Sequence, residues 1–180
     1  ERLVELEAGV VRTRPIKGTR KRGFDELEDS RLRIELVSSE KEISEHLMLV
    51  DLERHDLSSV CVPGTVHWSG WRIEALSNVQ HLVSGVEGLL DGRYSTSEVT
   101  STMFTGGSVT GCPKTVTLAA IDELEGGPRG AWTGSIGHIH RGQGVADWNI
   151  LIRTLETHSG PEKWHATVQA GGGVVIGSSP

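Results

Sequence analysis

Apolar residues recur at helical spacing in one long stretch of the chain, residues 38–57. Ile43, Leu47 and Val50 lie at positions i, i+4 and i+7, which is the period of a helix with one buried stripe. Ser39 is a suitable N-cap, and Glu42 three residues later completes a capping-box pattern. The pattern therefore predicts a helix of about five turns around which the rest of the chain is organised.

Alternation of apolar and polar residues predicts strands on both sides of this helix. The expected strands are two within 1–14 with a turn at 7–9, two around 63–64 within 60–71, one at 79–83, a hairpin within 131–155 with its turn at 141–144, and one at 165–170. Residues 21–37 are highly charged and are expected to form a loop. These patterns predict a mixed α and β domain.

A Gly/Ser/Thr-rich loop at 105–111 runs directly into a second predicted helix that begins at Pro113. Its buried face is expected to consist of Val116, Ala120, Ile121 and Leu124, and Gly126 to Pro128 should end it. A glycine loop before a helix is a favourable anion site. The spacing departs from a Walker A loop, because Cys112 and Pro113 intervene before Lys114, so nucleotide binding is disfavoured.

The composition argues against two classes of protein, those that bind nucleic acids and those that span membranes. A formal net charge of −6 argues against a nucleic-acid surface, and no apolar run approaches the length of a membrane span. Two isolated cysteines suit a reducing cytoplasm. Most informative are the 23 glycines, which cluster at 106–111 and 171–173 and suggest backbone approaching a ligand. Because the sequence starts and stops within apparent patterns, we expect a fragment of a longer domain.

Three charged side chains are candidates for chemistry. Glu42 and Glu45 project one turn apart, and paired carboxylates of this kind can bind Mg²⁺, although a solvated helix start would look the same. Lys17 follows the rigid Pro15 and precedes the permissive Gly18. It is either a nucleophile or anion ligand, or a surface lysine in a basic turn.

Histidines and an arginine extend the set of candidates. His81 lies on a strand, where it either reaches a ligand or is simply packed, whereas His138 and His140 are expected to be exposed strand residues rather than metal ligands. Arg153 lies in an apolar segment that predicts a buried strand, so its guanidinium should be ion-paired or bind a carboxylate. Gly171 to Gly173 would let backbone N–H groups face a ligand.

Five segments together resemble the chorismate-utilising enzymes, which include anthranilate, aminodeoxychorismate and isochorismate or salicylate synthases. They are P-I-K-G-T-R at 15–20, E-H-L-M-L-V-D-L at 45–52, G-G-S-V-T-G at 106–111, I-L-I-R-T at 150–154 and Q-A-G-G-G at 169–173. The lysine in P-I-K-G-T, where anthranilate synthases usually carry alanine, and the G-G-S-x-T-G loop make the resemblance closest to aminodeoxychorismate synthase component I. His55 and Cys112 depart from the family pattern.

The resemblance implies that chorismate and ammonia are converted to 4-amino-4-deoxychorismate with Mg²⁺. Lys17 would add to C2 of chorismate and expel the C4 hydroxyl, Glu1 would act as acid and base, and His81 would lie near the reacting ring. Glu42 and Glu45 would bind Mg²⁺. The implied substrate contacts are Thr19, Ser108, Arg153, Gly171, Gly172 and Gly173.

The resemblance also implies the fold and the partners. Residues 1–180 would be one chorismate-binding domain, a sandwich of two mainly antiparallel sheets with outer helices, incomplete at both ends and lacking a final helix that bears a further Mg²⁺ carboxylate. Ammonia would come from a glutamine amidotransferase subunit or domain; neither nucleic acid nor membrane is expected. The alternatives are anthranilate or isochorismate/salicylate synthase on the same scaffold, or an inactive fragment that only binds. The enzyme would supply 4-amino-4-deoxychorismate to folate synthesis or to another pathway that uses this product.

Overall fold

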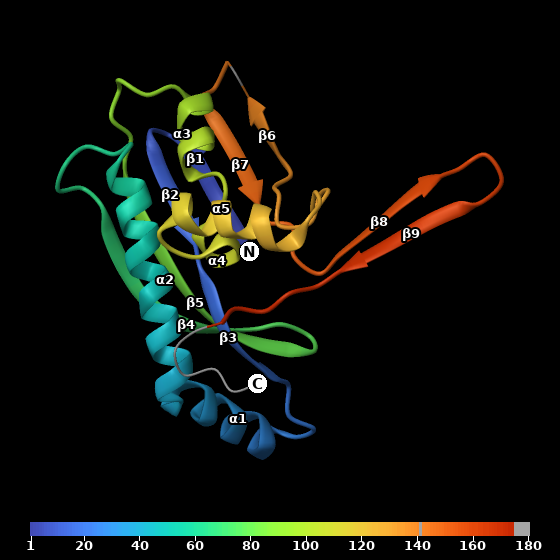
Figure 1. The fold of residues 1–180 in the computed structure, drawn as a ribbon. Helices are drawn as coiled ribbons and strands as arrows, with labels where there is room; N and C mark the ends of the chain where they lie inside the picture. Colours follow the sequence, from blue (N-terminus) through green and yellow to red (C-terminus); the bar gives the residue numbers. More distant parts are fainter. Residues whose placement is uncertain (141, 175–180) are drawn as a thin grey trace.

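The strands form one large antiparallel sheet and one separate hairpin. The structure, a computed structural model, describes residues 1–140 and 142–174 (Figure 1). Seven strands make the large sheet, with order β3-β5-β2-β1-β7-β6 and β4 also paired to β5. Their bounds are β1 (Arg2–Glu7), β2 (Val10–Arg14), β3 (Ile16–Lys21), β4 (His67–Ala75), β5 (Val79–Leu89), β6 (Gly137–His140) and β7 (Val145–Asn149). The hairpin of β8 (Thr154–Ser159) and β9 (Trp164–Gln169) projects away from the body (Figure 1).

Five helices accompany the strands in the described part of the chain. They are α1 (Glu26–Ser38), α2 (Glu40–Ser58), α3 (Thr96–Met103), the single turn α4 (Gly107–Thr110) and α5 (Lys114–Glu125). The long α2 runs along one face of the sheet, and α1 lies across the lower end of α2 (Figure 1). None of these helices is both long enough and apolar enough to cross a bilayer.

The core lies between α2 and the middle of the large sheet. Its buried residues come from β1, β2, β5, β7, α2 and α3, and they include Leu3, Leu6, Val11, Val50, Leu57, Val86 and Met103. Complete burial of one such side chain stabilises the fold by about 1.5–3 kcal/mol. The predicted mixed fold with mainly antiparallel strands is therefore confirmed, and the second sheet consists of two strands within the described residues.

Local signals located several boundaries correctly. Strands β1 and β2 are joined by the expected two-residue turn, in which Ala8 (φ 51°) and Gly9 (φ 75°) both adopt positive φ, as a type I′ turn requires. Helix α2 begins after Ser39, whose side chain accepts a hydrogen bond from the Glu42 N–H. Gly126 ends α5 in the left-handed conformation. Arg141 of the predicted turn at 141–144 lies outside the described residues.

Three sequence predictions about secondary structure and burial are wrong. Residues 21–37 contain helix α1 rather than a loop, because Asp25 caps it and Leu32 and Leu36 pack into the interior. The strand expected before residues 63–64 is reduced to a single bridge between Cys61 and Leu90. Helix α5 buries none of its residues, so its predicted apolar face is exposed in the described structure.

The buried stripe of α2 also differs from the prediction. Val50 is buried as expected, but Leu47 is 39% exposed. The buried positions are His46, Leu49, Val50, Glu53 and Leu57. Two of these residues, His46 and Glu53, are polar. The buried face of the helix is therefore rotated relative to the face that the apolar residues alone would predict.

Candidate functional site

A β-bulge places Lys17 beneath helix α2. In the pairing of β3 with β5, Ile16 lies opposite Val83 but Thr19 lies opposite His81, so β3 has one extra residue at this point. Gly18 accommodates the bulge with φ 94°, a conformation that side chains with a Cβ rarely adopt. A Cβ at Gly18 would also lie 3.2 Å from Glu42 Oε2, so a larger residue would push this side chain aside by a few tenths of an ångström.

Lys17 is held by a carboxylate of α2. Its Nζ lies 2.9 Å from Glu45 Oε2, and the Glu45 side chain is only 12% exposed. The backbone at Gly173 comes close from the other end of the chain, since a Cβ there would lie 3.6 Å from Lys17 Nζ. Three segments that the sequence singled out separately therefore meet at Lys17.

Glu42 and Glu45 lie on neighbouring positions of α2 but have different partners. Glu42 Oε1 accepts a hydrogen bond from Arg20 Nη1 at 3.2 Å, and Arg20 also donates to Glu35 at 2.8 Å. The expected capping box is therefore only half formed: Ser39 caps the Glu42 N–H, while the Glu42 side chain turns to Arg20.

By their chemistry the carboxylates of Glu42 and Glu45 are oxygen donors of the kind that Mg²⁺ prefers, and in this structure they are ion-paired with Arg20 and Lys17 respectively. Mg²⁺ in proteins is usually bound by one or two carboxylates together with water and substrate oxygens. Among the described residues no group of three or more His, Cys, Asp or Glu side chains is arranged to hold a metal by itself. Glu42 and Glu45 would thus supply two ligands and leave the remaining positions to other oxygens.

Thr19 and His81 form a linked pair beside this cluster. Thr19 Oγ1 lies 2.8 Å from His81 Nδ1, and both side chains are half-buried. Burial, and after it the positive charge of Arg153, lowers the pKa of His81. His81 is therefore neutral at physiological pH and can donate or accept a hydrogen bond.

Arg153 is near the site but is not buried in a strand, so that prediction is wrong. It lies in an irregular segment between β7 and β8 with φ 50°, and its side chain is exposed. The apolar residues around it misled the prediction, because Ile152 is also 44% exposed. A solvated guanidinium here remains free to contact an anion.

Glu1 is half-buried, and its carboxyl group lies next to the glycine loop. Its carbonyl accepts a hydrogen bond from Ile150 N–H at 3.0 Å, which ties it to the end of β7. Burial raises the pKa of Glu1, while nearby Ser108 and the charge of Lys17 act in the opposite direction. Glu1 Oε1 and Ser108 Oγ are both buried without a well-aligned hydrogen-bond partner among the described residues. Glu1 therefore has the burial and the neighbours of an acid–base group.

The three glycines near the end are not equivalent. All are exposed, and only Gly173 approaches Lys17. A Cβ at Gly171 would lie 2.8 Å from the Trp132 ring, whereas Gly172 has open space around it. The structure therefore brings Gly173 to the cluster and leaves the ligand contacts of Gly171 and Gly172 as predictions.

Sequence reasoning missed two buried polar residues of α2. His46 is fully buried, and its Nε2 lies 2.6 Å from Ser84 Oγ, which also accepts a hydrogen bond from Trp68 Nε1. This contact fixes the helix next to Glu45. Glu53 is 3% exposed, and burial raises its pKa to about 8. A polar residue in register with the apolar stripe was the available signal for both.

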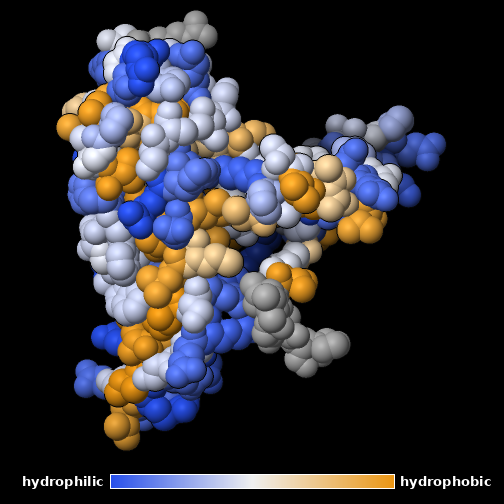
Figure 2. All heavy atoms as spheres, turned by 60° about the vertical axis from the view of Figure 1, so that its left-hand side comes forward, coloured by the Kyte–Doolittle hydropathy of each residue, from blue (hydrophilic) through white to orange (hydrophobic). Residues whose placement is uncertain are grey.

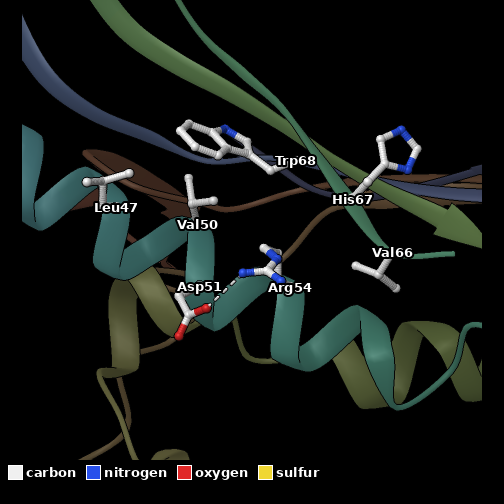
Figure 3. A pocket seen from close by; sticks show the side chains of 7 residues that line it. All are labelled: Leu47, Val50, Asp51, Arg54, Val66, His67 and Trp68. Atoms are coloured by element: carbon white, nitrogen blue, oxygen red, sulfur yellow. Dashed lines mark hydrogen bonds and ion pairs between the residues drawn. The ribbon is translucent and has the colours of Figure 1, made fainter. Parts of the chain in front are cut away.

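The hollow between α2 and β4 is a separate feature. It is lined by Leu47, Val50, Asp51, Arg54, Val66, His67 and Trp68 (Figure 3). Arg54 and Glu45 are nine residues apart, which at about 100° per residue puts them on opposite sides of the helix. Figure 2, which brings this side of the molecule forward, shows apolar side chains gathered among polar ones rather than one continuous apolar face. The hollow does not belong to the Lys17 cluster.

Comparisons with known proteins agree on a family. The model of the family described as "chorismate binding enzyme" matches residues 1–180. The chain is 47% identical over 181 residues to the anthranilate synthase component I-like protein of Synechocystis sp., and 44% identical over 181 residues to aminodeoxychorismate synthase component 1 of Bacillus subtilis. The alignments cover all of this chain but only 36% and 37% of those two relatives.

A solved structure has the same fold over most of the chain. The crystal structure of anthranilate synthase component I from Streptococcus pneumoniae superimposes with a TM-score of 0.76 at 35% identity. The match covers 86% of this chain and 34% of that one. The chain therefore spans about a third of the proteins that it resembles.

Proposed function

The chain belongs to the family of chorismate binding enzymes, and from that premise we propose that it forms the reacting part of an aminodeoxychorismate synthase. Such an enzyme converts chorismate and ammonia to 4-amino-4-deoxychorismate. The observation that carries the proposal is Lys17 on the β3 bulge, with its Nζ 2.9 Å from Glu45 and close to Gly173. A lysine in this place offers an amine to a substrate that enters between β3 and α2.

The charges around Lys17 suit a dicarboxylate substrate. Lys17 and Arg153 supply positive charge, and the exposed backbone at Gly173 can donate an N–H hydrogen bond. Thr19 and the neutral His81 add uncharged hydrogen-bonding groups at one side. These groups would bind and orient chorismate even though the whole chain is acidic.

Lys17 must lose a proton before it can attack. In the ion pair described above, Glu45 stabilises the charged ammonium, and only the neutral amine is nucleophilic. Glu1 is the buried carboxyl group whose pKa is influenced by Lys17, so it would accept this proton. The amine would then form a bond to C2 of chorismate while the C4 hydroxyl leaves, and Glu1 would return its proton to that hydroxyl.

Mg²⁺ would be held by Glu42 and Glu45. When bound, it would supply positive charge to a carboxylate of the substrate. A glutamine amidotransferase subunit or domain would deliver ammonia, which would enter at C4 and displace the lysine.

Anthranilate synthase is the second candidate, and relatives that bear this name favour it. The complete protein that carries this chain should be incubated with chorismate, ammonium and Mg²⁺, and the product identified by mass. We expect 4-amino-4-deoxychorismate, and anthranilate would establish the second candidate instead.

The role of Lys17 is tested by Lys17→Ala at saturating ammonium. We expect loss of most of the 4-amino product, whereas Lys21→Ala, which changes a more exposed lysine of the same strand, serves as the matched control. Without ammonia, the unsubstituted protein should gain the mass of a chorismate-derived adduct on Lys17. Product formation by Lys17→Ala at the parental rate would exclude covalent catalysis by this residue.

A further inference from the structure

The two carboxylates that would hold Mg²⁺ have cationic partners from strand β3. Lys17 Nζ lies 2.9 Å from Glu45 Oε2, and Arg20 Nη1 lies 3.2 Å from Glu42 Oε1. The Glu45 and Glu42 side chains are only 12% and 24% exposed, so these ion pairs are screened less than pairs at an open surface. A divalent cation that binds here therefore competes with charges that the protein itself supplies.

Arg20 is anchored by several acceptors. Besides Glu42, its guanidinium donates to Glu35 of α1 at 2.8 Å and to the carbonyl oxygen of Thr19 at 2.9 Å. A guanidinium is planar and presents its donors in a rigid fork, so contacts in several directions fix its position. Glu42 is therefore held by a cation that other groups keep in place.

Lys17 is held less firmly than Arg20. Among the described residues its ammonium forms an ion pair with Glu45 alone, and its side chain is 34% exposed. An ammonium on a flexible four-carbon chain can turn away from one partner without disturbing the backbone. The other oxygen of Glu45, Oε1, lies 3.9 Å from Nζ of Lys41, whose side chain is 63% exposed. Lys17 is therefore the half-buried partner that a second cation at Glu45 can displace.

We propose that Lys17 is a built-in counter-ion of the metal site, which pairs with Glu45 when no divalent cation is bound and leaves it when one binds. This inference rests on the proposed function, in which Glu42 and Glu45 hold Mg²⁺. Two positive charges that share one carboxylate repel each other, and the repulsion is stronger in a half-buried site than in water. Arg20 keeps its place, so the ammonium of Lys17 is the group that turns away. Metal binding is thereby coupled to the release of the nucleophile.

The affinity for Mn²⁺ in the absence of chorismate tests this competition. Mn²⁺ takes the same kind of oxygen ligands as Mg²⁺, and electron paramagnetic resonance measures its free concentration. In the complete protein, Lys17→Met should bind Mn²⁺ at least about fivefold more tightly than the unsubstituted protein, because the coupling acts equally in both directions. Lys17→Arg keeps the charge and should bind Mn²⁺ like the unsubstituted protein. Lys41→Met, which removes the exposed partner of the same carboxylate, should change the affinity by about twofold or less.

Glu45→Gln identifies the site that is measured, since this variant should lose the Mn²⁺ binding. Equal affinities of Lys17→Met and the unsubstituted protein would overturn the proposal. Binding that survives in Glu45→Gln, or no measurable binding by either the unsubstituted protein or Lys17→Met, would overturn it as well.

The position of Lys17 provides a second readout that requires no variant. Lysines of the complete protein can be acetylated with an N-hydroxysuccinimide ester and identified by peptide mass. Addition of Mg²⁺ should raise the labelling rate of Lys17 several-fold, because the amine leaves its carboxylate, whereas the exposed Lys21 should label at the same rate throughout. An unchanged rate at Lys17 would refute the displacement. Neither measurement depends on the product, so a protein that shows both effects but forms anthranilate would refute the proposed function and not this inference.

Discussion

Glu53→Gln is expected to stabilise the fold increasingly as the pH rises. Burial raises the pKa of Glu53 from 4.5 to about 8. In the unfolded chain the carboxyl group loses its proton near pH 4.5, whereas in the folded protein it keeps the proton up to about pH 8. Folding therefore takes up a proton in this interval, and the free energy of unfolding falls as the pH increases through it.

The magnitude follows from the size of the pKa shift. Each unit of pKa difference is worth about 1.4 kcal/mol, so the full interval corresponds to at most about 5 kcal/mol above pH 8. Relaxation of the interior around the charge makes the realised cost smaller. Even about 2 kcal/mol would be a sizeable part of the 5–15 kcal/mol that stabilises a typical domain. Glutamine has nearly the same shape and carries no such cost.

Urea unfolding followed by tryptophan fluorescence measures the effect. Free energies of unfolding should be obtained at pH 5, 7 and 9 for the unsubstituted protein, for Glu53→Gln and for the exposed control Glu123→Gln. The advantage of Glu53→Gln should be small at pH 5 and largest at pH 9, while the control should run parallel to the unsubstituted protein. A constant difference between Glu53→Gln and the unsubstituted protein across this range would show that Glu53 does not titrate as proposed.

Five further substitutions test the packing and the metal ligands. Gly18→Ala should cost about 1–2 kcal/mol in unfolding experiments because φ is 94°, and it should also lower turnover by disturbing the neighbouring lysine; unaltered stability and turnover would contradict the role of the bulge. Gly107→Ala should cost about 1–3 kcal/mol, because its Cβ would lie 1.9 Å from Leu52 Cδ2, and Leu52→Ala should restore part of this in a double-mutant cycle. Glu45→Gln should abolish Mg²⁺-dependent turnover in the complete protein and leave the circular dichroism spectrum intact, whereas Glu42→Gln should have the smaller catalytic effect. Unchanged Mg²⁺-dependent turnover in Glu45→Gln would exclude Glu45 as a ligand.

The features that the sequence predicted well depend on local chemistry. The turn at Ala8 and Gly9, the cap at Ser39 and the stop at Gly126 are each determined by a few adjacent residues. Lys17 also belongs to this class, because the flanking proline and glycine mark an unusual backbone whatever lies across from it. Such features can be predicted without knowing which segments pack together.

Features that depend on packing partners were harder to predict. Helix α1 carries charges around most of its circumference and buries only Leu32, Leu36 and the paired Asp29, so its apolar signal is weak. Its cap at Asp25, which accepts from Glu28 N–H, was the better indicator. Conversely, the apolar spacing of α5 predicts a buried face that the described structure leaves exposed.

The same distinction between local features and features that depend on packing applies to the candidate site. Sequence motifs identified Glu42 and Glu45 as a pair, but only the three-dimensional arrangement shows that one contacts Arg20 and the other Lys17. The environment of Glu53 could not be predicted from the sequence, because it depends on the register of β1 with β2 and on the placement of α5. A carboxyl group in a helix is ordinarily solvated.

The position of β1 between β2 and β7 has a consequence for how the protein is made. Strand β2 follows β1 directly, and hairpins of this kind close within about 1–10 μs. Strand β7 lies roughly 140 residues further along, so its pairing must close a very long loop and comes late. During synthesis one edge of β1 therefore stays without its partner until most of the chain has been translated. Exposed strand edges invite pairing with other chains, so the yield of folded protein should depend on crowding by nascent chains and on chaperones that shield this edge.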